Sequence, residues 1–281
     1  MRLSTIIFEG TEQAAVVTPR GFVPVTHINS QLGKNWPTDL YALIVAGIDN
    51  QLARDAERVT NAVDRTTVKV APLYRHPRKI WGIGLNYRDH AQDLNAPFPT
   101  EPASFMKNDN TIIGPSEAIE LPPQSERVTA EAEIGVIIGR TCRAVSERDA
   151  KSYLAGYCLI IDMTAEDILL KNPRFLTRSK NFDTFFSFGP ELITTDEVPD
   201  VLALTVGTYN NGKLYRENQV RNMAFQPDYL VSFHSHVATL YPGDIISTGT
   251  PGAVPIAAGD VTECRIASLG TLSNPVIRRT W

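Results

Sequence analysis

Two glutamates that are two residues apart, Glu131 and Glu133, lead directly into the apolar, β-branched run at residues 136–138. In a β-strand, side chains alternate between the two faces, so both carboxylates would point to the same side, one pleat apart. Adjacent carboxylates repel each other, and burying either one without compensation is costly. The pattern therefore predicts a positive partner between them, and a divalent cation is the simplest one. A solvated strand face with two exposed acids is the alternative.

A third acid, Asp162, follows the apolar residues 159–161 at the end of a predicted buried strand. Aspartates are uncommon in a protein core unless they are paired or bound to a metal. Three carboxylates facing one point would form an oxygen-only site, which suits Mg²⁺, Mn²⁺ or Ca²⁺ better than zinc. The alternative is that Asp162 caps a helix that begins near Ala165.

His90 and Asp93 are three residues apart in a polar segment that directly follows a predicted strand. If this segment begins a helix, the two residues share a face, so the carboxylate would orient the imidazole and raise its basicity. This is the arrangement of a general base with its orienting group. A pair with this spacing is also common on ordinary protein surfaces.

Two further stretches could stabilise negative charge. Lys180 could neutralise charge that develops in a reaction, and the turn at residues 248–252 offers hydroxyls and backbone N–H groups to a carboxylate or oxyanion. Gly82 and Gly84 invite a dinucleotide-binding interpretation, but position 87, where the third glycine would stand, is a tyrosine. The sequence therefore gives little support to a nicotinamide cofactor.

A proline-marked polar link at residues 72–77 divides the chain. We place a small N-terminal α+β domain at residues 1–74, with strands at 4–8 and 14–17 and a helix at 36–59, and the main domain at residues 75–281. The main domain is predicted to contain helices at 148–154 and 227–240, strands at 79–85, 104–106, 119–121, 157–161, 204–209, 213–216, 244–248 and 261–266, and a type I′ turn at 211–212. Strands dominate without regular alternation with helices, which favours a β-rich α+β fold, a mixed β-sandwich or roll, over a doubly wound sheet.

Composition limits the classes of partner. The chain has 281 residues, 43% of them hydrophobic, so it can bury a full core, and its net charge of -4 gives no electrostatic reason to expect nucleic acid or an anionic membrane. The three cysteines (Cys142, Cys158, Cys264) are odd in number and far apart, which favours a reducing compartment. The N-terminus lacks the apolar region of a signal peptide, and no apolar run is long enough to span a membrane. We therefore expect a cytoplasmic protein.

Eight motifs, taken together and in order, resemble the fumarylacetoacetate hydrolase family. Each motif is weak alone, but their order is specific, and the resemblance covers roughly residues 78–277. The motifs are Gly84-Leu85-Asn86-Tyr87-Arg88-Asp89-His90-Ala91, Phe105-Met106-Lys107, Glu131-Ala132-Glu133, Gly156-Tyr157 leading to Asp162-Met163-Thr164-Ala165, Ser179-Lys180-Asn181-Phe182-Asp183-Thr184, Asn211-Gly212, Pro242-Gly243-Asp244, and Thr248-Gly249-Thr250-Pro251.

The resemblance implies the mixed β-sandwich roll of this family, usually a homodimer, preceded here by the small N-terminal domain. It places the metal ligands on Glu131, Glu133 and Asp162, and the catalytic residues on His90, Asp93 and Lys180, with His90 and Asp93 in a segment that covers the substrate in relatives. It places substrate contacts on Tyr87, Arg88, Lys107 and Thr250. The stretch after Asp162 is most similar to the acylpyruvase and oxaloacetate decarboxylase branch.

The chain departs from the family pattern just after Asp162. Many relatives carry an arginine and a glutamine there, and that arginine helps to hold a substrate carboxylate; this chain has Glu166 and Leu169 instead. A short 2-oxo acid bound in the usual way is therefore less expected, unless Arg174 or Arg178 takes over. The loop after Thr250 is also short, which could alter the wall of the pocket.

The combined features predict an enzyme, a divalent-metal-dependent hydrolase that cleaves a C–C bond in a 1,3-dicarbonyl compound, either an acylpyruvate or a β-diketone-like molecule. The cation would chelate two substrate oxygens, His90 would deprotonate an attacking water, and the leaving carbanion would become a metal-bound enolate. Lys180 and Thr250 would stabilise oxyanion charge. The alternatives on the same scaffold are a decarboxylase of a 2-oxo acid such as oxaloacetate, an isomerase and, in a different class, a non-catalytic binding protein.

Overall fold

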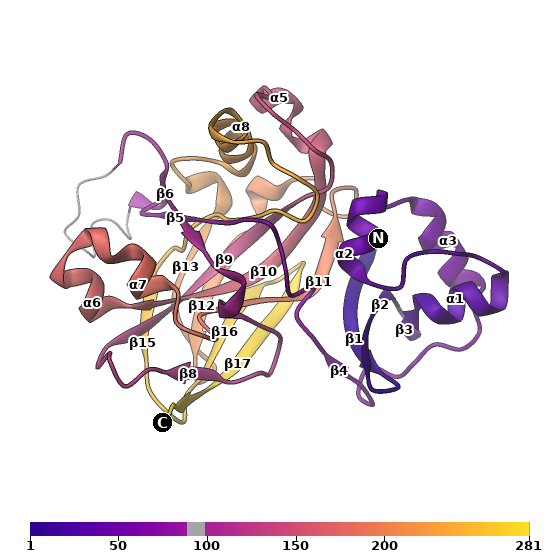
Figure 1. The fold of residues 1–281 in the computed structure, drawn as a ribbon, viewed down its shortest axis with the longest axis horizontal. Helices are drawn as coiled ribbons and strands as arrows, with labels where there is room; N and C mark the ends of the chain where they lie inside the picture. The colour runs from indigo at the N-terminus through magenta and orange to yellow at the C-terminus, as the bar shows by residue number, and fades with distance from the viewer. Residues whose placement is uncertain (89–98, 281) are drawn as a thin grey trace.

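A computed structural model of the chain describes residues 1–88 and 99–280. Over these residues the protein is a strand-rich α+β fold in which two sheets pack face to face (Figure 1), as the sequence predicts. Helices lie at the ends and on the outer side of the sheets. Within the described ranges, no helix combines the length and the apolar character that crossing a bilayer requires.

The larger sheet runs through the whole molecule. Its strands are β1 (Arg2–Phe8), β2 (Thr11–Thr18), β3 (Gly21–Pro24), β4 (Lys69–Val70), β5 (Ile80–Gly84), β6 (Ala103–Lys107), β7 (Ile112–Ile113), β9 (Val128–Ile138), β10 (Leu154–Ala165), β11 (Phe186–Thr194), β14 (Ile245–Ser247) and β15 (Ala253–Ile256). They follow the order β3-β2-β1-β11-β10-β9-β14-β5-β6, with β4, β7 and β15 paired to β1, β11 and β9. The central strands β9 and β10 are therefore flanked on both sides, which buries them.

The smaller sheet packs on one face of β9 and β10. Its strands, in order, are β13 (Lys213–Gln219), β12 (Thr205–Asn210), β16 (Val261–Ile266), β17 (Gly270–Arg278) and β8 (Ile119–Leu121). The predicted hairpin is confirmed, because β12 and β13 pair across Asn211 and Gly212, whose φ values of 50° and 74° are those of a type I′ turn. Strand β17 was not predicted from the sequence.

Helices and 3₁₀ turns connect the strands. They are α1 (Val25–Leu32), α2 (Leu40–Ala46), α3 (Asn50–Arg58), α5 (Glu147–Ala150), α6 (Glu166–Lys171), α7 (Leu176–Lys180) and α8 (Pro227–Val237), with 3₁₀ turns η1 (Asp109–Thr111), η2 (Lys151–Tyr153), η3 (Pro173–Phe175), η4 (Val201–Ala203) and η5 (Val220–Asn222). The helix predicted at residues 36–59 is wrong as a single element: Gly47, at φ 91°, separates α2 from α3. Each helix has its own N-cap, Asp39 for α2 and Asp49 for α3.

Elements β1–β3 and α1–α3 form a lobe at the right of Figure 1. Its sheet is continuous with that of the main body, because Arg2 and Leu3 of β1 pair with Ile193 and Leu192 of β11. The division at residue 74 remains a prediction, based on the link in the sequence.

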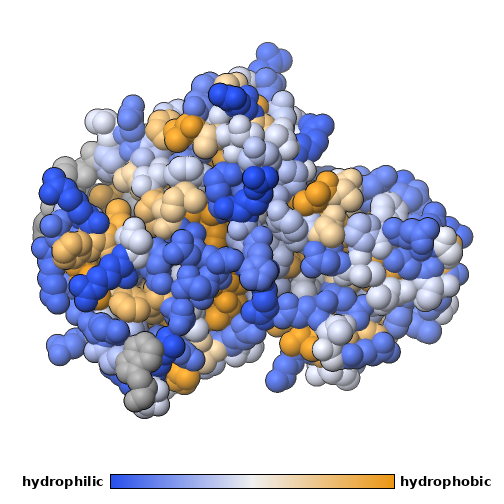
Figure 2. Space-filling model, in the orientation of Figure 1, coloured by the Kyte–Doolittle hydropathy of each residue, from blue (hydrophilic) through white to orange (hydrophobic). Residues whose placement is uncertain are grey.

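The alternation of side chains along β9 divides the interior into two cores. Ala132, Ile134 and Val136 face the smaller sheet, while Ile137 belongs to a second core that contacts the N-terminal helices. Because the apolar side chains fill these cores, hydrophilic residues predominate on the face shown in Figure 2, and the hydrophobic ones form small separate groups. Glu131 and Glu133 are at odd-numbered positions of β9, so their side chains lie on the same face of the strand as Ile137, opposite the smaller sheet.

Candidate functional site

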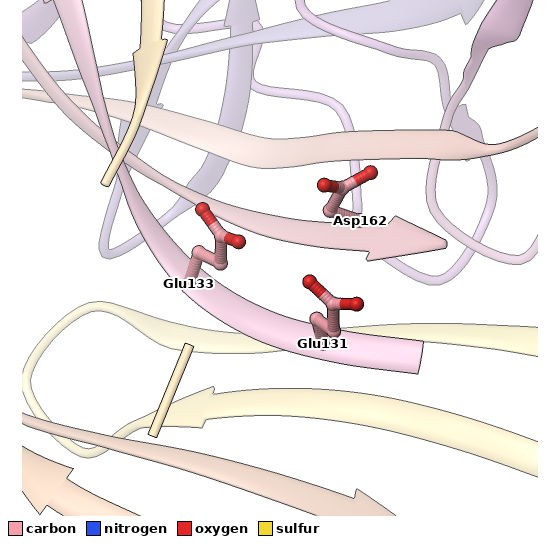
Figure 3. A group of neighbouring side chains, drawn as sticks. All are labelled: Glu131, Glu133 and Asp162. Atoms are coloured by element: carbon pink, nitrogen blue, oxygen red, sulfur yellow. The ribbon is translucent and has the colours of Figure 1, made fainter. Parts of the chain in front are cut away.

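Strand register brings three carboxylates together. Glu131 and Glu133 lie in the strand β9, as the sequence predicts, and Asp162 of β10 is the direct cross-strand partner of Glu131. All three side chains project from the same side of the two strands (Figure 3). One carboxylate oxygen of each residue lies within 4.8 Å of the others. This spacing is short enough for one ion to contact all three.

The two structural alternatives for these acids are wrong. Glu133 and Asp162 are 1% exposed, so β9 does not present two acids to solvent. Asp162 lies within β10 and caps no helix: α6 begins at Glu166 and its cap position is Ala165. Buried carboxylates that face one another require positive charge nearby.

Two lysine ammonium groups supply part of that charge. Lys180, the last residue of α7, places its Nζ 2.7 Å from Asp162 Oδ2 and 2.9 Å from Glu131 Oε2. Lys107, the last residue of β6, places its Nζ 2.7 Å from Asp162 Oδ1. Burial opposes the charge on both. At Lys180 the charges of Asp162 and Glu131 outweigh burial and raise the pKa, whereas at Lys107 burial outweighs Asp162 and lowers the pKa.

Glu133 is almost fully buried, like Asp162. Burial, reinforced by the charges of Asp162 and Glu131, raises its pKa to about 8. Its Oε2 accepts hydrogen bonds from Ser247 Oγ at 2.5 Å and from the backbone N–H of Gly249 at 2.7 Å. These donors fix the carboxylate but do not neutralise it. The site therefore still favours an additional positive charge.

The turn after β14 holds this glutamate. The residue types of this turn predict a cradle for a carboxylate or oxyanion, and the group that its Gly249 N–H contacts is the carboxylate of Glu133. Gly249 has φ 96°, and a Cβ there would lie 2.8 Å from Cβ of Asn86, so a side chain does not fit. Asn86 in turn donates a hydrogen bond to the carbonyl of Thr248. Asn86 therefore helps to fix the turn that contacts Glu133.

Three groups around the acids were missed as site residues. The Thr164 hydroxyl donates a hydrogen bond to Glu131 Oε1 at 2.5 Å. Ser247 and Gly249 contact Glu133 as described. Thr164 could have been found, because it stands two residues after Asp162 on the same face of a strand. The turn was expected to hold a carboxylate, but no local pattern indicates that this carboxylate is Glu133, which is more than 100 residues away in the chain.

The other predicted site residues lie in varied surroundings, and their predicted roles stay predictions. Tyr87 is fully buried, and burial, with a contribution from the charge of Glu133, raises its pKa. Arg88 is exposed. The Thr250 hydroxyl is engaged within its own turn, where it donates to the carbonyl of Gly252 at 3.1 Å. His90 and Asp93 lie outside the described residues.

The departures from the family pattern have local explanations. Glu166 forms an ion pair with Arg127 at the start of α6. Arg174 and Arg178 are exposed, and Arg178 is two residues from Lys180 on α7, about 200° around the helix from the side chain that reaches the acids. The short loop expected after Thr250 contains a strand: β15 pairs with β9, and its Ala253 lies opposite Glu131.

These donors suit a hard divalent cation. The group offers carboxylate oxygens alone, without histidine or cysteine, and oxygen ligands are those that Mg²⁺, Mn²⁺ and Ca²⁺ prefer. Burial and mutual repulsion make the three acids costly without such a charge. The chemistry of the donors therefore fits a metal ion.

Comparisons with known proteins agree with this assignment. Residues 79–277 match the family described as fumarylacetoacetate (FAA) hydrolase C-terminal. A mitochondrial oxaloacetate tautomerase of Xenopus laevis is 36% identical over 224 residues, which cover 76% of this chain and 70% of that protein. An uncharacterized protein of Archaeoglobus fulgidus is 42% identical over 217 residues, covering 77% of this chain and 85% of that protein. The crystal structure of a maleylpyruvate hydrolase from Sphingobium sp. SYK-6, in complex with manganese(II) and pyruvate, has a TM-score of 0.83 at 28% identity and covers 100% of both chains.

Proposed function

Because this chain belongs to the fumarylacetoacetate hydrolase family, we propose that it is a divalent-metal-dependent hydrolase that cleaves a C–C bond in a 1,3-dicarbonyl compound, such as an acylpyruvate. The observation that carries the proposal is a group of three carboxylates, two of them buried, with the ammonium of Lys180 beside Glu131 and Asp162. The maleylpyruvate hydrolase with manganese(II) and pyruvate supports both the cation and the class of product.

Glu131, Glu133 and Asp162 would hold the cation, most simply Mg²⁺ or Mn²⁺. When bound, the cation supplies a Lewis acid that polarises the substrate oxygens. The protein's own contribution is to keep the three carboxylates in place: Thr164 fixes Glu131, and Ser247 and the Gly249 N–H fix Glu133. Such outer contacts orient ligands before the substrate arrives.

Lys180 would stabilise the negative charge that grows as the bond breaks. A water adds to the distal carbonyl carbon, the C–C bond then breaks, and its electron pair passes to the carbon beside the remaining carbonyl, whose oxygen takes up the charge. Protonation of that carbon completes two products, a carboxylic acid and a 2-oxo acid. The Lys180 ammonium already stands among the carboxylates, and a fixed positive charge of this kind lowers the barrier without reorganising.

We assign the removal of a proton from the attacking water to His90, oriented by Asp93, on the spacing of the two residues in the sequence. The variant His90→Ala tests this role. It should still bind Mn²⁺, because the carboxylates are untouched, and it should lose hydrolysis. Undiminished hydrolysis in this variant would remove His90 from the mechanism.

The experiment that tests the function is turnover of a panel of acylpyruvates, neutral β-diketones and oxaloacetate, first with Mg²⁺ or Mn²⁺ and then with a chelator. Metal-dependent release of two carbon fragments is the expected result. The best substrate would also show whether the Arg127–Glu166 pair leaves room for a substrate carboxylate. Absence of turnover across the panel with bound metal would contradict the hydrolase.

A second candidate is a tautomerase acting on a 2-oxo acid of the oxaloacetate type. The relatives named oxaloacetate tautomerase favour it, and it uses the same stabilised enolate charge without an attacking water. Product analysis separates the candidates: a tautomerase leaves the substrate mass unchanged, a decarboxylase releases CO₂, and the hydrolase yields two fragments.

A further inference from the structure

The side chain of Lys107 is enclosed by the protein. Its side chain is 0% exposed, and its ammonium has two protein partners. One is Asp162 Oδ1 at 2.7 Å, and the other is the backbone carbonyl of Lys180, to which the ammonium donates a hydrogen bond. Both partners are groups of the protein itself, and the substrate contact that the family resemblance implied for Lys107 stays a prediction.

We propose that Lys107 is a positioning residue of the metal site, which fixes the orientation of Asp162 and the end of α7 that carries Lys180. The inference rests on the metal binding proposed above. It assigns different tasks to two lysines that share one aspartate: Lys180 contacts two of the three acids, whereas Lys107 contacts only Asp162 and does so from β6.

The physical reason lies in the two oxygens of Asp162. Oδ1 forms an ion pair with Lys107 and Oδ2 accepts a hydrogen bond from Lys180, so each oxygen faces one ammonium group. The carbonyl of Lys180 is at the last position of a helix, where no residue further along the helix can donate to it. Lys107 satisfies this carbonyl too. Without the Lys107 ammonium, the orientation of the Asp162 carboxylate would no longer be fixed, and the Lys180 ammonium could move toward Oδ1.

An opposing effect makes the test decisive. Removing a positive charge beside the acids should, by Coulomb attraction alone, tighten the binding of a divalent cation. Losing a group that orients a metal ligand weakens binding, typically by about 10–100-fold. The two explanations for Lys107, general charge balance and positioning, therefore predict changes of opposite sign.

The chain contains a matched control. Lys79, the residue before β5, pairs with the fully buried Asp244, with Nζ 2.5 Å from Oδ2. It lies close to Lys107 in the fold, because the neighbouring Ile80 is the cross-strand partner of Lys107. Neither Lys79 nor Asp244 contacts the three acids in the described structure. Lys79→Met therefore removes a lysine–aspartate pair outside the metal site.

The experiment compares wild type, Lys107→Met, Lys107→Gln and Lys79→Met in the full-length chain. Mn²⁺ binding is measured by electron paramagnetic resonance or calorimetry well below the unfolding temperature, and Tm is measured without metal. We expect Lys107→Met to bind Mn²⁺ at least about tenfold more weakly. Lys79→Met should lower Tm and keep the wild-type affinity. Lys107→Gln retains one hydrogen-bond donor group and should fall between wild type and Lys107→Met.

The outcomes distinguish this inference from the function on which it rests. Wild type that binds no Mn²⁺ would overturn the proposed metal-dependent function. Wild type that binds Mn²⁺, with equal or tighter binding by Lys107→Met, would overturn the positioning role alone. If Lys107→Met does not fold, Lys107→Gln decides, and wild-type affinity in that variant would count against the inference. Equal weakening by Lys79→Met would also overturn it, since the effect would then be general.

Discussion

Two fully buried acids, Asp55 in the N-terminal lobe and Asp162 in the site, show what distinguishes a structural acid from a functional one. Among the described residues, the partners of Asp55 are hydrogen-bond donors and cations. Its Oδ2 accepts from Trp36 Nε1 at 3.1 Å and lies 3.6 Å from Lys34 Nζ, while its Oδ1 accepts from Gln51 Nε2 at 2.9 Å. Asp162 has two lysines, but it also has two other carboxylates within reach of one ion.

The pKa directions express the same contrast. Burial raises the pKa of a carboxyl in either region. At Asp55 the hydrogen bonds from Gln51 and Trp36, with the charge of Lys34, reverse this effect and leave the pKa lowered. At Glu133 the neighbouring acids add to burial and raise the pKa to about 8. A buried acid whose environment works against its charge is a candidate for function, whereas one whose environment supports it stabilises the fold.

The largest expected effect follows from removing a charge in the site. Glu133→Gln keeps the shape and leaves Ser247 and Gly249 with an oxygen to contact. Because a ligand carboxylate is lost, Mn²⁺ affinity should fall by more than the roughly 100-fold that loss of outer partners can cost. Metal-free stability should not fall, since the amide ends the repulsion with Asp162 and Glu131. Calorimetry and thermal unfolding measure the two results. Unchanged affinity would contradict the assignment of Glu133 as a ligand.

Asp55→Asn should give the reverse result. The amide presents N–H groups to Gln51 Nε2 or Trp36 Nε1, so a buried donor loses its acceptor. The expected cost is about 1–3 kcal/mol in the free energy of unfolding, measured with denaturant, while Mn²⁺ affinity stays at the wild-type value. A loss of metal binding in folded Asp55→Asn would remove the contrast between the two regions.

Gly249→Ala tests how firmly the site depends on its turn. A side chain at φ 96° is strained and would meet Asn86, so we expect a loss of about 1–3 kcal/mol in unfolding free energy. The N–H that holds Glu133 should shift, so Mn²⁺ binding should weaken as well. Gly212→Ala is the matched control: its φ is 74°, but a Cβ there has no neighbour within 4 Å. The control should lose stability without weaker Mn²⁺ binding.

Local sequence pattern predicted where the acids of the site lie on their own strands. The alternation around Glu131 and Glu133 and the apolar run before Asp162 placed the acids on adjacent positions of one face, and the register of β9 and β10 confirmed that geometry. The contacts of Lys107 were not predictable, because an ion pair between distant segments leaves no periodic signal in sequence. Local pattern also failed in β17, where Asn274 reads as a turn residue although it is fully buried in the strand.

The N-terminal lobe shows the same limit. Apolar spacing alone predicted one helix over residues 36–59, because α2 and α3 continue one periodic pattern across Gly47. Backbone conformation, and not hydrophobicity, separates them. The role of Asp55 was equally hidden, since its donor Trp36 comes from the segment before α2. The sequence thus predicted that the carboxylates of the site would lie together, but it did not predict that Asp55 would be surrounded by hydrogen-bond donors.

The smallest expected effect is a difference in pH dependence, which measures the contrast directly in metal-free protein. A lowered pKa at Asp55 means that its contribution to stability is present above the ordinary value of 3.8 and is lost as the pH falls through the lower folded value. A raised pKa at Glu133 means that the folded state binds the proton more tightly. The contribution of Glu133 to stability is therefore present below pH 4.5, its ordinary pKa, and is lost as the pH rises through about 8.

In Asp55→Asn, unfolding free energy should therefore fall less steeply than in wild type below pH 4. In Glu133→Gln it should fall less steeply between pH 5 and about 8. Denaturant titrations of the three proteins with chelator present, over pH 3 to 9, measure both windows. Parallel curves for all three would show that neither acid responds to its surroundings as these contacts require.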